Sequence, residues 1–203
     1  MWGGILHNFK KGNTYYFFYI IMSYSQENNN NCQSAYFGGG CFWCIEAIFE
    51  DLKGVKQVIN GYAGGDEETA NYKDVSAGNT QHVEVCKITY DSNIISFKVL
   101  LEVFFLAHDP TKKNRQGDDI GPQYQSIILY SNSQEKEKIE NYMDMLDGGG
   151  IHNIKTKIIP YKKFYKAENY HQNYFKLNPN LPYCSLVINP KLKKLREKLK
   201  KYY

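Results

Sequence analysis

Hydrophobic and polar residues alternate along five short stretches of the chain, as they do in half-buried strands. These stretches are residues 35–37, 55–62, 82–90, 124–130 and 154–159. Between them, hydrophobic residues recur at helical spacing, which indicates the buried face of an amphipathic helix. Such stripes predict helices after residues 41, 96 and 133, and a short helix at 166–175. This order of strands and helices predicts a two-layer α/β sandwich rather than a doubly wound sheet.

Residues 1–33 differ in composition from the rest of the chain. They contain a basic pair, an aromatic run from Tyr15 to Met22 and a polar stretch rich in asparagine. The apolar run has only about eight residues, whereas roughly 20 are needed to span a bilayer. We therefore expect a flexible extension at 1–33 and a single folded domain at 34–203. A cytoplasmic location is expected, and the extension leaves targeting to an organelle open.

The positive charge of the chain comes from one segment. The formal net charge is +4 at pH 7, and residues 191–201 hold seven basic residues against the single Glu197. The rest of the chain is slightly negative, which argues against a nucleic-acid partner. Leu192, Leu195 and Leu199 stand at helical spacing, so we expect a C-terminal amphipathic helix with a solvated basic face. Binding of that face to a membrane surface or an anion is the alternative.

The number and spacing of the cysteines exclude two kinds of cysteine site. The five cysteines are Cys32, Cys41, Cys44, Cys86 and Cys184. An odd and sparse set does not form a secreted disulfide framework, and the spacing is too uneven for a tetrahedral zinc site. We expect a reducing compartment in which the thiols are reactive or buried.

Cys41 follows the glycine run Gly38–Gly40 at a predicted change from strand to helix. The run lets the backbone turn sharply, and the free N–H groups of a helix start stabilise a thiolate. We therefore expect Cys41 to be nucleophilic near neutral pH; a small buried hydrophobe is the alternative. Cys44 lies one turn further on, where it either closes a disulfide with Cys41 or packs.

Two kinds of neighbour would complete a thiol site. Phe42 and Trp43 are either core residues or an aromatic wall for an apolar methyl group. Glu84 alternates onto the same strand face as Cys86, and burial there would raise its pKa, as a general acid at neutral pH requires. The alternative is a carboxylate at a frayed strand end.

Polar groups on predicted loops are further candidates. Tyr72 and Tyr124 are placed where a phenol can donate to a substrate oxygen. Asp119 and His108 lie on the loop before Tyr124, where they either orient a polar network or cap turns.

Ordered motifs then give a resemblance. They are Gly40-Cys41-Phe42-Trp43-Cys44-Ile45-Glu46, Gly61-Tyr62-Ala63-Gly64-Gly65, Gln81-His82-Val83-Glu84-Val85, Gln116-Gly117-Asp118-Asp119-Ile120-Gly121, Gln123-Tyr124-Gln125-Ser126 and Ala167-Glu168-Asn169-Tyr170-His171-Gln172. In order and spacing, over roughly residues 36–195, the chain resembles type A peptide methionine sulfoxide reductases. The resemblance implies an α+β fold with a mixed sheet and a ferredoxin-like core.

It also implies a reaction. The S epimer of methionine sulfoxide, free or in proteins, would be reduced to methionine in repair of oxidative damage. Cys41 would be the nucleophile, and Phe42 and Trp43 the methyl pocket. Glu84 would be the acid, with Tyr72, Tyr124 and Asp119 around the sulfoxide oxygen. A sulfenic acid on Cys41 would become an intramolecular disulfide that thioredoxin reduces. No bound cofactor, metal, nucleic acid or membrane is expected, and nothing demands more than a monomer.

The second thiol of that disulfide is open. Cys184 occupies the place of the resolving cysteine in the resembled family, on a segment that we expect to be mobile. Many members have glycine where this chain has Cys44, which makes Cys44 the alternative. Cys86 is expected to be a buried thiol.

Two rival interpretations differ in class. One is a general dithiol oxidoreductase that uses Cys41-Phe42-Trp43-Cys44 as a redox motif. The other is a metal site made of Cys41, Cys44, Cys184 and a histidine.

Overall fold

A six-stranded sheet is the centre of the described part of the chain, which in this computed structural model is residues 31–203. The strand order is β7-β6-β1-β3-β2-β8. The strands are β1 (Cys32–Gly38), β2 (Val55–Ala63), β3 (Val83–Asp91), β6 (Ile127–Tyr130), β7 (Lys157–Pro160) and β8 (Tyr165–Lys166). Neighbours are antiparallel except β6 and β7, which are parallel, so the sheet is mixed. The extension predicted at 1–33 lies outside the described residues except for its last three positions.

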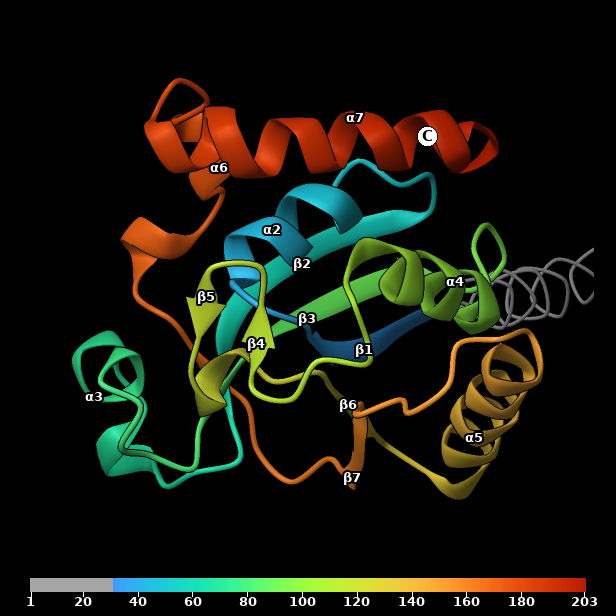
Figure 1. Cartoon of the computed structure of the whole chain (residues 1–203), viewed down its shortest axis with the longest axis horizontal. Helices are drawn as coiled ribbons and strands as arrows, with labels where there is room; N and C mark the ends of the chain where they lie inside the picture. The colour runs from blue at the N-terminus through green and yellow to red at the C-terminus, as the bar shows by residue number, and fades with distance from the viewer. Residues whose placement is uncertain (1–30) are drawn as a thin grey trace, which may run out of the picture. The chain divides into compact units, whose positions relative to one another are not determined.

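Helices pack on this sheet and make the fold α+β. The helices are α2 (Phe42–Phe49), α3 (Tyr72–Ser76), α4 (Phe97–Ala107), α5 (Ser133–Gly148), α6 (Tyr174–Leu177) and α7 (Asn189–Lys198). Figure 1 shows α2 lying between β2 and α7, and both elements contact it. A separate short hairpin joins β4 (Arg115–Gln116) and β5 (Asp119–Ile120). Within the described residues, no helix has both the length and the apolar character needed to cross a membrane.

The main core lies between the sheet and the helices α2, α4 and α7. Phe37 of β1 is fully buried, and its ring centre lies 4.8 Å from that of Phe104 and 5.7 Å from that of Phe49. Burial of a large side chain of this kind contributes about 1.5–3 kcal/mol. Three leucines of the C-terminal helical segment reach the same core: Leu192, Leu195 and Leu199. The helical spacing of those leucines thus reflects real packing, which fixes α7 on the body.

The predicted elements differ from the observed ones mainly at their ends. The strand expected at 124–130 begins only at Ile127, because Pro122–Tyr124 forms a 3-10 turn. The helix expected at 166–175 is replaced by β8, a 3-10 turn and the short α6, since Tyr165–Lys166 pairs with the edge of β2. The segment after Pro182, expected to be mobile, is helical from Cys184 and leads into α7.

The path from β1 into α2 depends on glycine at two positions. A Cβ at Gly38 would lie 2.6 Å from the backbone oxygen of Glu84 and 2.8 Å from Ile127. Gly40 has φ +91°, which side-chain-bearing residues rarely adopt,. β1 can therefore lie close to β3 and turn at once into the helix that carries Cys41 at its start.

Candidate active site

Cys41 is the N-cap residue of α2 and is buried, with 7% of its surface exposed. Its carbonyl oxygen accepts a hydrogen bond from the Cys44 amide at 3.0 Å. The Trp43 amide is hydrogen-bonded to the Cys41 sulfur and acts to lower the pKa of the thiol. The helix start thus contacts the sulfur directly, as the glycine run predicts.

Even so, the Cys41 thiol is not ionised at rest. Burial is the largest effect and raises its pKa well above the usual value, and the nearby Glu84, Cys44 and Asp119 raise it further. The prediction of a ready thiolate near neutral pH is therefore wrong. One helix N-terminus does not offset the loss of water together with two neighbouring carboxyl groups. Cys41 is a protonated thiol until something else removes its proton.

Glu84, in β3, is the closest partner of this helix start. Its carboxyl group accepts a hydrogen bond from the Phe42 amide at 2.9 Å, and only 2% of the residue is exposed. Burial raises the pKa of Glu84 to about 8, with a further increase from Asp119, while the Phe42 amide acts against it. Glu84 therefore carries a proton at neutral pH, as expected of a general acid. Its burial excludes the alternative of a frayed strand end.

Tyr72, Tyr124 and Asp119 come from three different segments and meet near the same thiol. Tyr72 begins α3, Tyr124 ends the 3-10 turn before β6, and Asp119 begins β5. Burial raises the pKa of Tyr124, and the charges of Glu84, Cys41 and Asp119 raise it further. Glu84 and Cys41 act on Tyr72 in the same direction, after burial. The structure thus brings Cys41, Glu84, Tyr72, Tyr124 and Asp119 together, whereas His108 lies elsewhere.

Phe42 and Trp43 face an aromatic enclosure beside the thiol. The Trp43 ring stacks on Tyr174 at 3.6 Å between ring centres, with only 4° between the planes. His171 lies 5.0 Å from Phe42, 5.6 Å from Trp43 and 4.5 Å from Tyr72, again between ring centres. Within the described residues, the Trp43 indole nitrogen and both His171 nitrogens are buried without a hydrogen-bond partner. The rings therefore form an apolar wall beside Cys41 that contains three polar nitrogens without a partner in the described part of the chain.

Sequence reasoning gave no role to several residues of this site. Glu168 accepts hydrogen bonds from the Tyr72 amide at 2.8 Å and from the Tyr62 hydroxyl at 3.0 Å, and so positions both. Glu168 and His171 belong to a motif that the sequence did show. Tyr183 donates to the Asp119 carboxylate at 2.9 Å. The chain has 18 tyrosines, and in the sequence only its position next to Cys184 distinguished Tyr183 from the others.

His108 has a structural role instead of one at the thiol. Its Nδ1 lies 2.7 Å from the Phe104 carbonyl oxygen, and its Nε2 lies 2.7 Å from the hydroxyl of Ser126, which in turn contacts Thr156. Burial lowers the pKa of His108 to about 4, so the ring is neutral. The network holds the entry to β6 beside α4.

The other cysteines fall into two groups. Cys44 and Cys184 are buried in one small cluster with Ala47 and Ile188. Cys86 is fully buried, and its thiol donates to the Asn60 side chain at 3.1 Å, as expected of a structural thiol. All five cysteines are free, and Cys32 is exposed.

No group of three or more metal-binding side chains gathers anywhere in residues 31–203.

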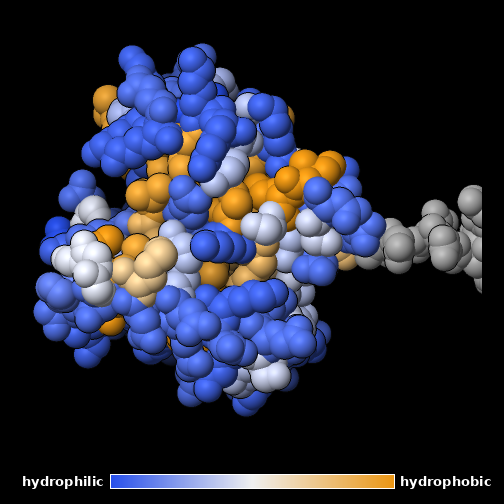
Figure 2. Space-filling view, turned by 90° about the vertical axis from the view of Figure 1, so that its right-hand side faces the viewer, coloured by the Kyte–Doolittle hydropathy of each residue, from blue (hydrophilic) through white to orange (hydrophobic). Residues whose placement is uncertain are grey.

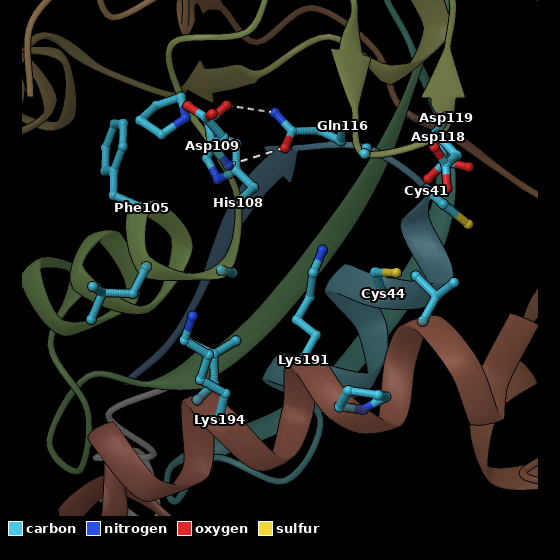
Figure 3. Close-up of a pocket in the computed structure, with 18 of the residues that line it drawn as sticks. Cys41, Cys44, Phe105, His108, Asp109, Gln116, Asp118, Asp119, Lys191 and Lys194 are labelled. Carbon is cyan, nitrogen blue, oxygen red and sulfur yellow. Dashed lines mark hydrogen bonds between the residues drawn. The ribbon is translucent and has the colours of Figure 1, made fainter.

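A cleft of about 800 Å³ opens beside the start of α2. Figure 3 shows Lys191 of α7 pointing into it, with Cys41, Cys44 and Asp119 at one end and His108 at the other. Burial raises the pKa of Cys44, and the charge of Lys191 acts against that increase. The cleft connects solvent with the Cys44 side of the site.

Known proteins show the same combination of sequence and fold. The family model for peptide methionine sulfoxide reductase matches residues 33–203. A peptide methionine sulfoxide reductase MsrA from Natronomonas pharaonis is 49% identical over 81% of this chain and 93% of its own.

Solved structures agree. Reduced Mxr1 from Saccharomyces cerevisiae has a TM-score of 0.71 at 31% identity, over 75% of this chain and 89% of its own. Methionine sulfoxide reductase A of Corynebacterium diphtheriae has a TM-score of 0.68 at 33% identity, over 77% and 79%. Mxr1 has also been solved in complex with Trx2, a structure that shares this fold at 21% identity and a TM-score of 0.51, over 68% and 81%.

Proposed function

This chain belongs to the family of peptide methionine sulfoxide reductases, and from that premise we propose that it reduces the S epimer of methionine sulfoxide through a cysteine sulfenic acid. As a member it is an oxidoreductase. The observation that carries the proposal is the juxtaposition of a buried thiol, Cys41, with a buried and protonated carboxyl, Glu84, beside an aromatic enclosure.

In the proposed first step, the Cys41 sulfur attacks the sulfoxide sulfur and loses its proton. Glu84 donates a proton to the sulfoxide oxygen, and the phenols of Tyr72 and Tyr124 hydrogen-bond to that oxygen. The hydroxyl so formed then moves from the methionine sulfur to the Cys41 sulfur. The sulfur–oxygen bond of the substrate and the transient sulfur–sulfur bond both break, so methionine leaves and Cys41 becomes a sulfenic acid, while the proton lost by the Cys41 thiol restores Glu84. Two electrons thus pass from the cysteine sulfur to the methionine sulfur.

The arrangement of the site supports selection of one epimer. A sulfoxide sulfur carries an oxygen, a methyl group, the rest of the side chain and a lone pair, so it is chiral. Glu84, Tyr72 and Tyr124 offer proton donors to the oxygen, whereas Phe42 and Trp43 offer an apolar wall to the methyl group. Exchanging the two substituents would leave the oxygen against aromatic rings and the donors without a partner.

The geometry favours one epimer, and the family resemblance implies that it is S. We expect the S epimer to be reduced at least about 100-fold faster than the R epimer, because the misfit leaves buried polar groups unpaired. The measurement is kcat/KM for each epimer of a blocked methionine sulfoxide, with dithiothreitol as reductant. Equal turnover of both epimers, or of the R epimer alone, would contradict the assignment of the oxygen and methyl sites.

Two thiols are proposed for the later steps. Cys44 supports a first disulfide with Cys41, because it lies one helical turn away and its charge acts on the Cys41 thiol. Cys184 is the thiol expected from the family, and it packs in one cluster with Cys44. We propose that Cys44 attacks the sulfenic acid and that Cys184 then displaces Cys41 from Cys44 by disulfide exchange. A thioredoxin would reduce the resulting Cys44–Cys184 disulfide.

Serine variants separate these roles. Cys184→Ser is expected to keep dithiothreitol-dependent activity and lose most turnover with thioredoxin, while still forming a Cys41–Cys44 disulfide. Cys44→Ser is expected to lose thioredoxin turnover and to accumulate sulfenic acid. The measurement is steady-state turnover with each reductant, with disulfides mapped by mass spectrometry after one turnover. If Cys44→Ser supports full thioredoxin turnover, Cys184 attacks Cys41 directly.

Thioredoxin as the reductant is part of the proposal. Yeast Mxr1 has been solved with Trx2, which supports a partner of this kind. Figure 2 shows apolar surface gathered in the middle of one face, within a hydrophilic rim. Leu106, Met145 and Ile151 are exposed, and Leu106 and Ile151 line the cleft that leads to Cys44. Exposed apolar surface of this kind is typical of protein-binding sites.

The core is also proposed to be ferredoxin-like. Apart from the short insertions that hold α3, β4 and β5, the chain runs β1, α2, β2, β3, α4 and β6, which is the succession βαββαβ. Their strands lie in the order β6-β1-β3-β2. This succession is the one expected of such a core.

A further inference from the structure

Tyr183 joins two parts of the site that are separate in the sequence. Its hydroxyl donates to Oδ2 of Asp119 at 2.9 Å, and the Cys44 sulfur lies 3.6 Å from the same hydroxyl oxygen. The ring meets Trp43 edge-on, with 5.9 Å between ring centres. Tyr183 also lines the cleft together with Cys41, Cys44 and Asp119. The phenol therefore stands between the Cys44 thiol and the Asp119 carboxyl group, which is itself hydrogen-bonded to the Cys41 amide.

Counting protons fixes the direction of these hydrogen bonds. A phenol has one proton and can accept a second hydrogen bond on its oxygen. Since the Tyr183 proton is donated to Asp119, the Cys44 thiol must be the donor at the other contact. Cys44, Tyr183 and Asp119 thus form a chain of two hydrogen bonds that both point toward Asp119.

We propose that Tyr183 passes the proton of Cys44 to Asp119 and so activates Cys44 as the thiol that attacks the sulfenic acid on Cys41. The inference rests on the proposed function, in which Cys41 becomes a sulfenic acid. As the Cys44 sulfur attacks the Cys41 sulfur, its proton moves to the Tyr183 oxygen and the Tyr183 proton moves to Asp119. The Cys41–oxygen bond breaks, and the leaving hydroxide takes the proton from Asp119 to become water. One thiol and one sulfenic acid thus become one disulfide and one water, with no further oxidant.

The setting of each group agrees with this path. Cys44 has only 2% of its surface exposed, so water is a poor acceptor for its proton. Burial raises the pKa of Cys44, so its proton leaves readily only to a group already in contact with the sulfur, which here is the Tyr183 hydroxyl. Burial raises the pKa of Asp119, which suits a group that takes a proton and gives it up again. The Cys41 amide is hydrogen-bonded to the Asp119 carboxylate, which places this proton beside the departing oxygen.

The test uses the full chain with Tyr183→Phe, which removes the hydroxyl and keeps the ring that packs against Trp43. Reduced protein is mixed with one equivalent of the S epimer and no reductant. Methionine release, sulfenic acid and the Cys41–Cys44 disulfide are followed by quenching and mass spectrometry, with dimedone to trap the sulfenic acid. The matched control is Tyr202→Phe, which also removes a phenol that donates to a carboxylate, here that of Glu102 at 2.9 Å, and which lies outside the site.

We expect disulfide formation in Tyr183→Phe to become at least about tenfold slower relative to methionine release, so that sulfenic acid accumulates. The variant rate should rise about tenfold per pH unit below the pKa of Cys44, because its proton must then leave to solvent. The wild type and Tyr202→Phe should show a shallower dependence on pH. A residue that only packs would not alter this pH profile.

The same measurement is repeated in a Cys184→Ser background, where Cys44 is left and Cys184 can no longer attack. The effect of Tyr183→Phe on the rate of disulfide formation should persist there. Disulfide formation in Tyr183→Phe at the wild-type rate and with the wild-type pH dependence would overturn the proposal. So would a first disulfide that links Cys41 to Cys184 in the wild type. If the wild type releases no methionine at all, the proposed function itself fails, and this result is distinct from the other two.

Discussion

Cys41→Ser is expected to abolish methionine release, with a loss in kcat/KM of at least about 10³-fold. The change replaces one atom at the start of α2 and leaves the helix itself intact. A serine hydroxyl is a much weaker nucleophile than a cysteine sulfur, and it cannot take up the oxygen as a sulfenic acid. The measurement is turnover of the S epimer with dithiothreitol.

Cys32→Ser is the matched control, because it makes the same atomic change at an exposed thiol. It should retain full activity. A melting curve for Cys41→Ser close to that of the wild type would show that the fold survives. Turnover by Cys41→Ser at the wild-type rate would mean that another thiol attacks the sulfoxide. The active site would then have to be assigned around that thiol and not around Cys41.

The second large effect is expected from Glu84→Gln, with a loss of about 10²- to 10⁴-fold in kcat/KM. Glutamine keeps a carbonyl oxygen that can accept from the Phe42 amide, so the geometry is retained while the transferable proton is lost. The pKa of Glu84 is raised to about 8, and the proposed mechanism uses its acid form. Wild-type activity should therefore fall as the pH rises through about 8, and this alkaline limb should be absent from Glu84→Gln.

The stability of the folded protein should also fall as the pH rises, because of Glu84. The pKa of Glu84 in the folded state is above its value of 4.5 in the unfolded chain, so the folded state binds the proton more tightly,. The contribution of Glu84 to stability is thus most favourable below pH 4.5 and declines as the pH rises toward 8. Glu84→Gln should melt at a higher temperature relative to the wild type at pH 8 than at pH 5. Glu102→Gln, at a partly buried carboxyl far along α4, should show neither change.

Full activity of Glu84→Gln would remove Glu84 from the reaction. An alkaline limb that persists in the variant would assign that titration to another group near the thiol, such as Tyr72.

The sequence predicted those parts of the site that depend on local pattern. Glycine before Cys41 indicated a sharp turn into a helix, and alternation in the strand at 82–90 indicated that Glu84 faces inward. Both rules involve only neighbours in the chain. The same is true of Leu192 and Leu195, whose spacing reflects one buried helix face.

What the sequence could not predict depends on groups brought together from distant segments. The protonation of Cys41 follows from burial and from Glu84 and Asp119, which lie at least 43 positions away in the chain. A helix start alone predicts a lowered pKa and an ionised Cys41. The raised pKa values of Cys41 and Cys44 also argue against the rival of a general dithiol oxidoreductase, whose attacking thiol has a lowered pKa. Tyr183 was indistinguishable from the other tyrosines until the fold placed it between Cys44 and Asp119.

The buried, protonated state of Cys41 has a consequence for how the enzyme survives the conditions in which it works. Peroxides oxidise thiolates far faster than thiols, and repeated oxidation ends in sulfinic and sulfonic acids that ordinary thiol reductants do not reverse. A cysteine that stays neutral at rest and has 7% of its surface exposed is a poor target for such oxidants. In the proposed mechanism, its reactivity appears only when a bound sulfoxide accepts a proton from Glu84. Oxidised methionine is thereby distinguished from the oxidant that produced it.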